Sequence, residues 1–226
     1  MKLKSMKQTF NNIIRQNQIF FVPILLFYLF AVYRIVFYSK IDNHLFFNQL
    51  VGNYYVDWFF KYLTYFGDGW VVVLVGILWL FKNIRQGLIL LLSYGIAGGL
   101  VAILKNYIFD VSRPHFVFDY FYKDIQVKYV DGVDLLALNS FPSGHSTSAL
   151  VLFTFIALHL NNNIYKLIMA IAGLLVAFSR VYLSQHWLND IVAGSCIGII
   201  LTLLIYTLFE KFQWLNKYDR SIGSGK

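Results

Sequence analysis

The sequence contains little cysteine, little proline and little charge. Cys196 is the only cysteine among 226 residues, which excludes an intramolecular disulfide and a cysteine-based metal cluster. Only 13% of the residues are charged, about half the share of an average soluble domain, whereas 58% are hydrophobic. These values exclude an ordinary soluble protein and indicate a chain that lies in a membrane.

Six apolar runs approach the roughly 20 residues that a membrane span needs. The second run reaches that length only with Tyr65 and Phe66, and it then has Asp68 at its outer end. The runs are Ile19–Tyr38, Gly69–Phe81, Leu88–Leu104, Ser146–Leu160, Ile164–Phe178 and Ile191–Phe209. The sequence therefore predicts an all-α fold, a bundle of six transmembrane helices.

The net charge of +8 is compatible with nucleic acid, anionic lipid or a biased membrane topology, so the distribution of the charge decides. With a cytoplasmic N-terminus, six spans leave most Lys and Arg residues on the cytoplasmic side. The positive-inside rule then predicts that both termini are cytoplasmic. The same segregation disperses any basic patch, so a nucleic-acid partner is not expected.

The predicted organisation is one membrane-embedded domain, residues 19–212, between a cytoplasmic N-terminal tail, residues 1–18, and a cytoplasmic C-terminal tail, residues 213–226. The longest polar interruption lies in an outer loop, residues 110–145, which is long enough to form a lid. The aromatic residues of segment 40–68 are typical of a belt at the level of the lipid headgroups. A contact with a substrate tail is the alternative for this segment.

The segment Phe141-Pro142-Ser143-Gly144-His145 leads directly into the fourth apolar run. Its backbone N–H groups are therefore expected at a helix N-terminus, which binds phosphate through free N–H groups and the helix dipole. Glycine allows an anion to approach the backbone closely. Taken alone, a simple capped helix start explains the segment better.

A second cluster, Ser179-Arg180 with His186 and Asp190, lies between the fifth and sixth runs. His186 and Asp190 share a helix face if the sixth helix begins near His186. Asp190 would then bind one imidazole nitrogen and leave the other free to attack, as in catalytic triads. The pair is explained equally well if Asp190 is only a helix N-cap and His186 only a histidine at the membrane interface.

Lys105 and Arg113-Pro114 form a third cluster at the outer end of the third run. An ionisable residue in an apolar span is functional by default, although a lysine at a span end also snorkels to the headgroups. The topology puts all three clusters on one side of the membrane. Three cations, two histidines, a carboxylate and a helix N-terminus at one face suit a phosphoryl group.

Together the three clusters resemble the type 2 phosphatidic acid phosphatase, or lipid phosphate phosphatase, superfamily. The family pattern is K-x6-RP, PSGH and SR-x5-H-x3-D, and this chain has Lys105…Arg113-Pro114, Pro142-Ser143-Gly144-His145 and Ser179-Arg180…His186…Asp190. The second and third motifs match in full. Seven residues separate Lys105 from Arg113 where six are usual, and a one-residue bulge at the span exit would absorb the difference. The resemblance covers roughly residues 60–210.

The resemblance implies a metal-independent membrane phosphatase without a cofactor, with its site at the outer membrane–water interface of a bacterial cytoplasmic membrane. His186 would become phosphohistidine, Asp190 would orient it, and His145 would protonate the departing lipid oxygen. The phosphoryl group would be held by Lys105, Arg113, Arg180 and the backbone of Ser143 and Gly144. The expected partners are membrane lipids and a lipid phosphate substrate.

Several alternatives stay open at the level of sequence. A phosphotransferase or a vanadate-dependent haloperoxidase shares this kind of anion pocket, although six spans argue against the haloperoxidase. A transporter would place its charges near the membrane midplane, and a purely structural protein needs no site. Phosphatidic acid, phosphatidylglycerol phosphate, undecaprenyl pyrophosphate and a lipid A phosphate are equally compatible substrates, and the sequence gives no oligomeric state.

Overall fold

The computed structural model describes residues 5–211, and this part of the chain is mainly helical, with no β-strand. The predicted all-α fold is confirmed. The helices are α1 (Met6–Gln16), α2 (Gln18–Phe37), α3 (Lys40–Asn48), α4 (Tyr54–Leu63), α5 (Gly69–Lys82), α6 (Ile84–Ile103), α7 (Pro114–Phe121), α8 (Gly144–Leu158), α9 (Asn163–Tyr182) and α10 (Leu188–Lys211). A 3-10 turn, η1 (Thr64–Gly67), precedes α5, and a π-helical turn, η2 (Leu104–Ile108), continues α6.

Within residues 5–211, four helices are long and apolar enough to cross a membrane: Gln18–Phe37, Ile84–Ile108, Asn163–Tyr182 and Leu188–Lys211. The pair Tyr54–Gly67 and Gly69–Lys82, bent by 54°, counts as a fifth if it is one span. Helix α8 is apolar but has only 15 residues. The structure therefore supports an integral membrane protein with four or five spans of full length, and it does not confirm exactly six.

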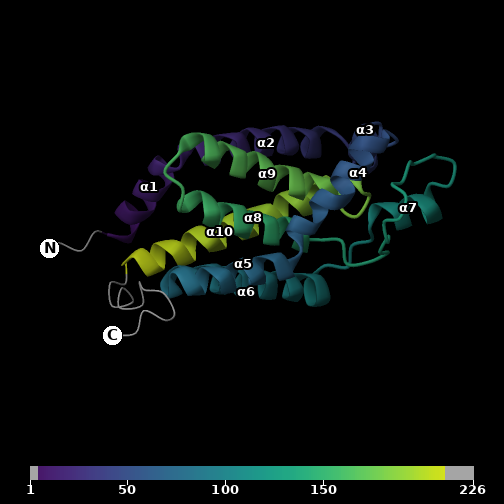
Figure 1. Cartoon of the computed structure of the whole chain (residues 1–226). Helices are drawn as coiled ribbons and strands as arrows, with labels where there is room; N and C mark the ends of the chain where they lie inside the picture. Colours follow the sequence, from purple (N-terminus) through teal and green to yellow (C-terminus); the bar gives the residue numbers. More distant parts are fainter. Residues whose placement is uncertain (1–4, 212–226) are drawn as a thin grey trace.

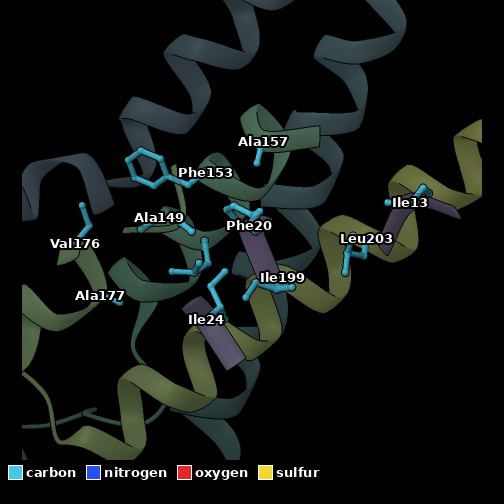
Figure 2. Packing of buried hydrophobic residues seen from close by; sticks show 12 residues of the cluster. Ile13, Phe20, Ile24, Ala149, Phe153, Ala157, Val176, Ala177, Ile199 and Leu203 are labelled. Atoms are coloured by element: carbon cyan, nitrogen blue, oxygen red, sulfur yellow. The ribbon is translucent and has the colours of Figure 1, made fainter. Parts of the chain in front are cut away.

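Helix α8 lies in the middle of the bundle, where it packs against α6, α9 and α10 (Figure 1). Most of its side chains are buried, because protein surrounds it on nearly all sides. In the largest apolar cluster, Ala149 and Phe153 of α8 meet Phe20 of α2, Val176 of α9 and Ile199 of α10 (Figure 2). The first turn of α8 is therefore held in a fixed position by its neighbours.

Two glycines allow α10 to approach α8 closely. A Cβ atom on Gly194 would lie 2.3 Å from the carbonyl oxygen of Ser143, and one on Gly198 would lie 2.5 Å from that of Thr147. Small residues four apart are a common way to bring membrane helices into contact. They place the start of α8 directly against the start of α10.

The connecting segments are more helical than the sequence analysis predicted. Residues 6–16 of the predicted N-terminal tail form α1, capped by the Ser5 side chain, and the outer loop contains α7. Helices α3, α4 and α7 lie at one end of the bundle, whereas α1 and the C-terminal end of α10 lie at the other (Figure 1). The predicted C-terminal tail, residues 213–226, lies outside the described residues.

Candidate active site

The three motif clusters meet at the end of the bundle that carries α7. Lys105 comes from η2, Arg113 directly precedes α7, and Arg180 lies in the last turn of α9. Lys105 and His145 line one cavity, and Arg180 and His145 line a second. Arg113 donates to Gln185, the residue before His186. The predicted site residues therefore surround one place in the structure.

His186 lies just before α10, and its ring faces the carboxylate of Asp190. The distance from Nδ1 to Asp190 Oδ2 is 3.4 Å, and the same oxygen accepts a hydrogen bond from the Trp187 amide at 2.9 Å. The Ser140 hydroxyl donates to this oxygen as well and lies 3.4 Å from His186 Nδ1. Asp190 is completely buried. The pairing predicted from the four-residue spacing is present, although the helix begins only at Leu188.

Burial lowers the pKa of His186 well below its usual value, and the positive charges of Arg113, Arg180 and Lys105 act in the same direction. The imidazole is therefore neutral near pH 7. A neutral imidazole has a free electron pair, which an attacking nucleophile requires.

His145 lies in the first turn of α8, and its Nε2 atom is 2.7 Å from Oδ1 of Asp68. In the sequence, Asp68 is distinguished only by its place at the outer end of the second apolar run. The available signal was its position between two glycines at the start of an apolar run, Gly67-Asp68-Gly69.

The start of α8 offers two open backbone amides. The Ser143 hydroxyl caps the helix by accepting a hydrogen bond from the Ser146 amide at 3.3 Å, and the Ser143 amide donates to the Asp190 carbonyl at 3.0 Å. The amides of Gly144 and His145 have no hydrogen-bond partner within residues 5–211. A Cβ atom on Gly144 would meet only Val101, at 4.0 Å. An anion thus has access to Gly144 and His145, whereas the Ser143 amide ties α8 to α10.

Lys105 and Arg180 differ in the groups to which they donate hydrogen bonds. The Lys105 ammonium donates to the Asn139 carbonyl at 2.9 Å, so it reaches the segment just before Ser140. Arg180 is almost completely buried and donates from one terminal nitrogen to the Thr64 hydroxyl at 2.7 Å. Its Nε atom is buried and has no partner in the described part of the chain.

The π-helical turn explains the unusual spacing of the first motif. A π-turn holds one residue more than an α-turn, and its i+5 hydrogen bond is visible between the Phe109 amide and the Leu104 carbonyl at 2.9 Å. Lys105 lies inside this turn. The predicted one-residue bulge at the span exit is confirmed.

Arg113 fastens the outer loop to the segment before α10. Its Nε atom donates to the Leu138 carbonyl at 2.9 Å, and one terminal nitrogen donates to the side-chain and backbone oxygens of Gln185 at 3.0 and 3.1 Å. Gln185 in turn donates to the Asp134 carbonyl at 2.7 Å. Sequence reasoning missed both Gln185 and Ser140, because neither belongs to a motif.

Two cavities meet at His145. The larger, about 380 Å³, is lined by Lys105 and His145 together with apolar or small residues of α6 such as Gly98, Val101 and Ala102. The smaller, about 190 Å³, is more polar and includes Asp68 and Arg180. Within residues 5–211 no group of three or more His, Cys, Asp or Glu residues is arranged to bind a metal ion.

The chain is similar to known proteins of one family. Residues 86–214 match the PAP2 superfamily. The chain is 30% identical over 153 residues to phosphatidylglycerophosphatase B of Bacillus subtilis (strain 168). The aligned region covers 63% of this chain and 68% of that protein. It is 31% identical over 78 residues to the lipid A 4'-phosphatase of Porphyromonas gingivalis, and this aligned region covers 34% of this chain and 33% of that protein.

Two solved structures share the fold. A transmembrane PAP2 type phosphatidylglycerolphosphate phosphatase from Bacillus subtilis superposes with a TM-score of 0.60 and 25% identity, over 84% of this chain and 96% of that one. LpxE from Aquifex aeolicus superposes with a TM-score of 0.63 and 24% identity, over 73% and 93% of the two chains. Fold and matches together define a helical membrane phosphatase. The chain belongs to the PAP2 superfamily, the type 2 phosphatidic acid phosphatases, in its integral membrane branch.

Proposed function

We propose that the protein hydrolyses the phosphomonoester or pyrophosphate of a lipid phosphate. The observation that carries this proposal is the larger cavity, whose lining combines Lys105 and His145 with small and apolar residues of α6. Such a cavity accommodates a charged headgroup and the beginning of an apolar chain at once. The activities named for the relatives in Bacillus subtilis and Porphyromonas gingivalis support the same substrate class.

In the first step, His186 attacks phosphorus through the ring nitrogen opposite the one that faces Asp190. The bond between phosphorus and the lipid oxygen breaks, and a phosphohistidine forms. Asp190 and Ser140 hold the ring and stabilise the positive charge that it acquires. His145 donates a proton to the departing oxygen, because an alkoxide is a poor leaving group without one.

In the second step, a water molecule attacks the phosphohistidine. His145, which lost its proton in the first step, takes one from this water. The bond between phosphorus and nitrogen breaks, inorganic phosphate leaves, and His186 returns to its neutral form.

Charge on the phosphoryl oxygens is neutralised by Lys105, Arg113 and Arg180 and by the open amides of Gly144 and His145. Preorganised charges and N–H groups in a site shielded from water stabilise the transition state of phosphoryl transfer. Ser143 contributes by fixing the start of α8 against α10. This division of roles requires no metal ion.

Purified, detergent-solubilised protein tests the proposal directly. Phosphate release is measured from phosphatidic acid, phosphatidylglycerol phosphate, undecaprenyl pyrophosphate and a lipid A phosphate. We expect release from at least one of them. Transfer of the phosphoryl group to an added alcohol, without net release, would instead define a phosphotransferase, and no reaction with any lipid would favour a transporter.

Metal chelation is expected to leave this activity largely intact, because three basic side chains supply the charge that metals supply in other phosphatases. The measurement is phosphate release before and after treatment with EDTA. Complete loss that magnesium restores would refute the assignment of charge neutralisation to Lys105, Arg113 and Arg180.

We further propose that the site faces outward from a bacterial cytoplasmic membrane and that both termini are cytoplasmic. The excess of Lys and Arg on the opposite side supports this orientation. A cysteine placed at Asp124, in a Cys196→Ala background, is expected to react with a membrane-impermeant thiol reagent added from outside. Labelling only from the cytoplasmic side would invert the topology.

A further inference from the structure

Asp68 lies at the bend between the pair α4–η1 and α5, and two glycines bring this bend against the site. A Cβ atom on Gly67 would lie 3.0 Å from both the Cβ atom and the carbonyl oxygen of His145, and one on Gly69 would lie 1.8 Å from the hydroxyl of Tyr94. A side chain at position 67 would press on His145, including its backbone, and one at position 69 would require Tyr94 to move. The break in this apolar helix pair therefore serves to place Asp68 next to the first turn of α8.

Both carboxylate oxygens of Asp68 are engaged. Oδ1 accepts from His145 Nε2 at 2.7 Å, and Oδ2 accepts from the indole nitrogen of Trp70 at 3.3 Å. The other ring nitrogen of His145, Nδ1, has no hydrogen bond to any residue from 5 to 211. The arrangement parallels that of Asp190 and His186, in which a carboxylate holds one nitrogen and leaves the other available.

The charges around His145 make this carboxylate necessary. Burial lowers the pKa of the His145 imidazole, and the positive charges of Arg180, Arg113 and Lys105 act in the same direction. A general acid must nevertheless carry a proton when the leaving group departs. Asp68 is the carboxylate in direct contact with the ring, and a negative charge at this distance favours the protonated imidazole.

The two cavities agree with such a role. His145 lines both of them, whereas Asp68 lines only the smaller, polar one. The carboxylate therefore approaches the imidazole from the polar side and leaves the larger cavity free for the substrate.

We propose that Asp68 is a positioning residue that orients the His145 imidazole and stabilises its protonated form while a proton passes to the departing lipid oxygen. This inference rests on the proposed function, which assigns the acid to His145. It adds a residue that lies outside the three motifs.

The test compares two leaving groups in the variant Asp68→Asn, which keeps the size of the side chain and an acceptor for Trp70 but removes the charge. The quantity is kcat/KM, which reports the steps up to release of the alcohol. For a lipid with an alkoxide leaving group we expect a fall of about 10- to 100-fold, a part of the 10²–10⁴-fold that general acid–base assistance usually contributes. For an aryl phosphate, whose leaving group needs no proton, kcat/KM should stay close to that of the wild type.

Two further variants complete the experiment. Trp70→Phe removes the second hydrogen bond of Asp68 but keeps its contact with His145, so it should change neither value. Asp68→Glu retains the charge and should restore part of the activity on the lipid. Size-exclusion profiles that match the wild type show that each variant is folded.

An equal loss on both substrates, or no loss on either, would overturn the role of Asp68 while leaving the proposed function intact. Failure of the wild-type protein to release phosphate from any lipid would instead overturn the proposed function, and this assignment with it.

Discussion

Replacing His186 by alanine is expected to abolish formation of the phosphoenzyme with every substrate. The buried imidazole is the proposed nucleophile, and an alanine leaves no atom that can attack phosphorus. The measurement is the rapid burst of phenol release from an aryl phosphate, which reports the first turnover before hydrolysis limits the rate. The burst should be absent in His186→Ala.

His145→Ala should behave differently, because it loses an acid and a base rather than the nucleophile. On a lipid phosphate we expect a loss of about 10²–10⁴-fold, the usual contribution of general acid–base assistance. On an aryl phosphate the burst should persist, since that leaving group needs no proton, and turnover should then stop before hydrolysis. His145→Ala should therefore accumulate phosphoenzyme.

His115→Gln serves as the matched control, because His115 lies in α7 at the same end of the bundle and has no role in the proposed mechanism. Its burst and turnover should resemble those of the wild type. A burst that disappears in His145→Ala but persists in His186→Ala would mean that nucleophile and acid are assigned the wrong way round.

Replacing Gly194 by alanine is expected to damage both stability and activity. The new Cβ atom would lie 2.3 Å from the Ser143 carbonyl oxygen, and a backbone atom cannot move aside as the end of a flexible side chain does. Overpacking of this kind usually costs roughly 1–3 kcal/mol of stability. Because Ser143 begins the segment that carries His145, phosphate release should fall as well.

Gly99→Ala in α6 provides the control for this prediction. A Cβ atom there meets nothing within 4 Å, and alanine is favoured over glycine in a helix by up to about 1 kcal/mol. Thermal unfolding in detergent is the measurement. If both glycine variants melt at the wild-type temperature and keep full activity, the close contact between α8 and α10 does not hold the site in place.

Much of the site could be predicted because the motif residues are local in sequence and chemically distinctive. His186 and Asp190 are four apart, and that spacing alone indicates their pairing. The extra residue between Lys105 and Arg113 likewise indicates a bulge, which appears as the π-turn η2. Apolar runs predict most spanning helices, since burial in lipid imposes a clear pattern.

The residues that were missed act through contacts between distant parts of the chain. Ser140 reaches Asp190, and Gln185 binds Arg113 over 72 positions. Asp68 reaches His145 only because Gly67 and Gly69 allow the helix pair to bend. Hydropathy detects an apolar segment but not a break within it, so the sequence places this carboxylate at a span end rather than in the site.

The hydrogen bond from the Ser143 amide to the Asp190 carbonyl could not be predicted from sequence for a similar reason. A helix start in the sequence indicates free N–H groups, but which of them remain free depends on what packs against that turn. Here the start of α10 lies so close that the Asp190 carbonyl takes the Ser143 amide. The structure supports four or five full-length spans and does not confirm exactly six, because α8 has only 15 residues and the apolar pair Tyr54–Gly67 and Gly69–Lys82 is bent.

Rapid-quench trapping of the phosphoenzyme tests the central claim most directly. Purified protein is mixed with a radiolabelled lipid phosphate, denatured in base within milliseconds, and digested so that the labelled peptide can be sequenced. The account predicts an acid-labile, base-stable phosphoryl group on the peptide that contains His186, transient in the wild type. A phosphoryl group on any other residue, or turnover of the lipid with no trapped phosphoprotein at any time, would contradict it.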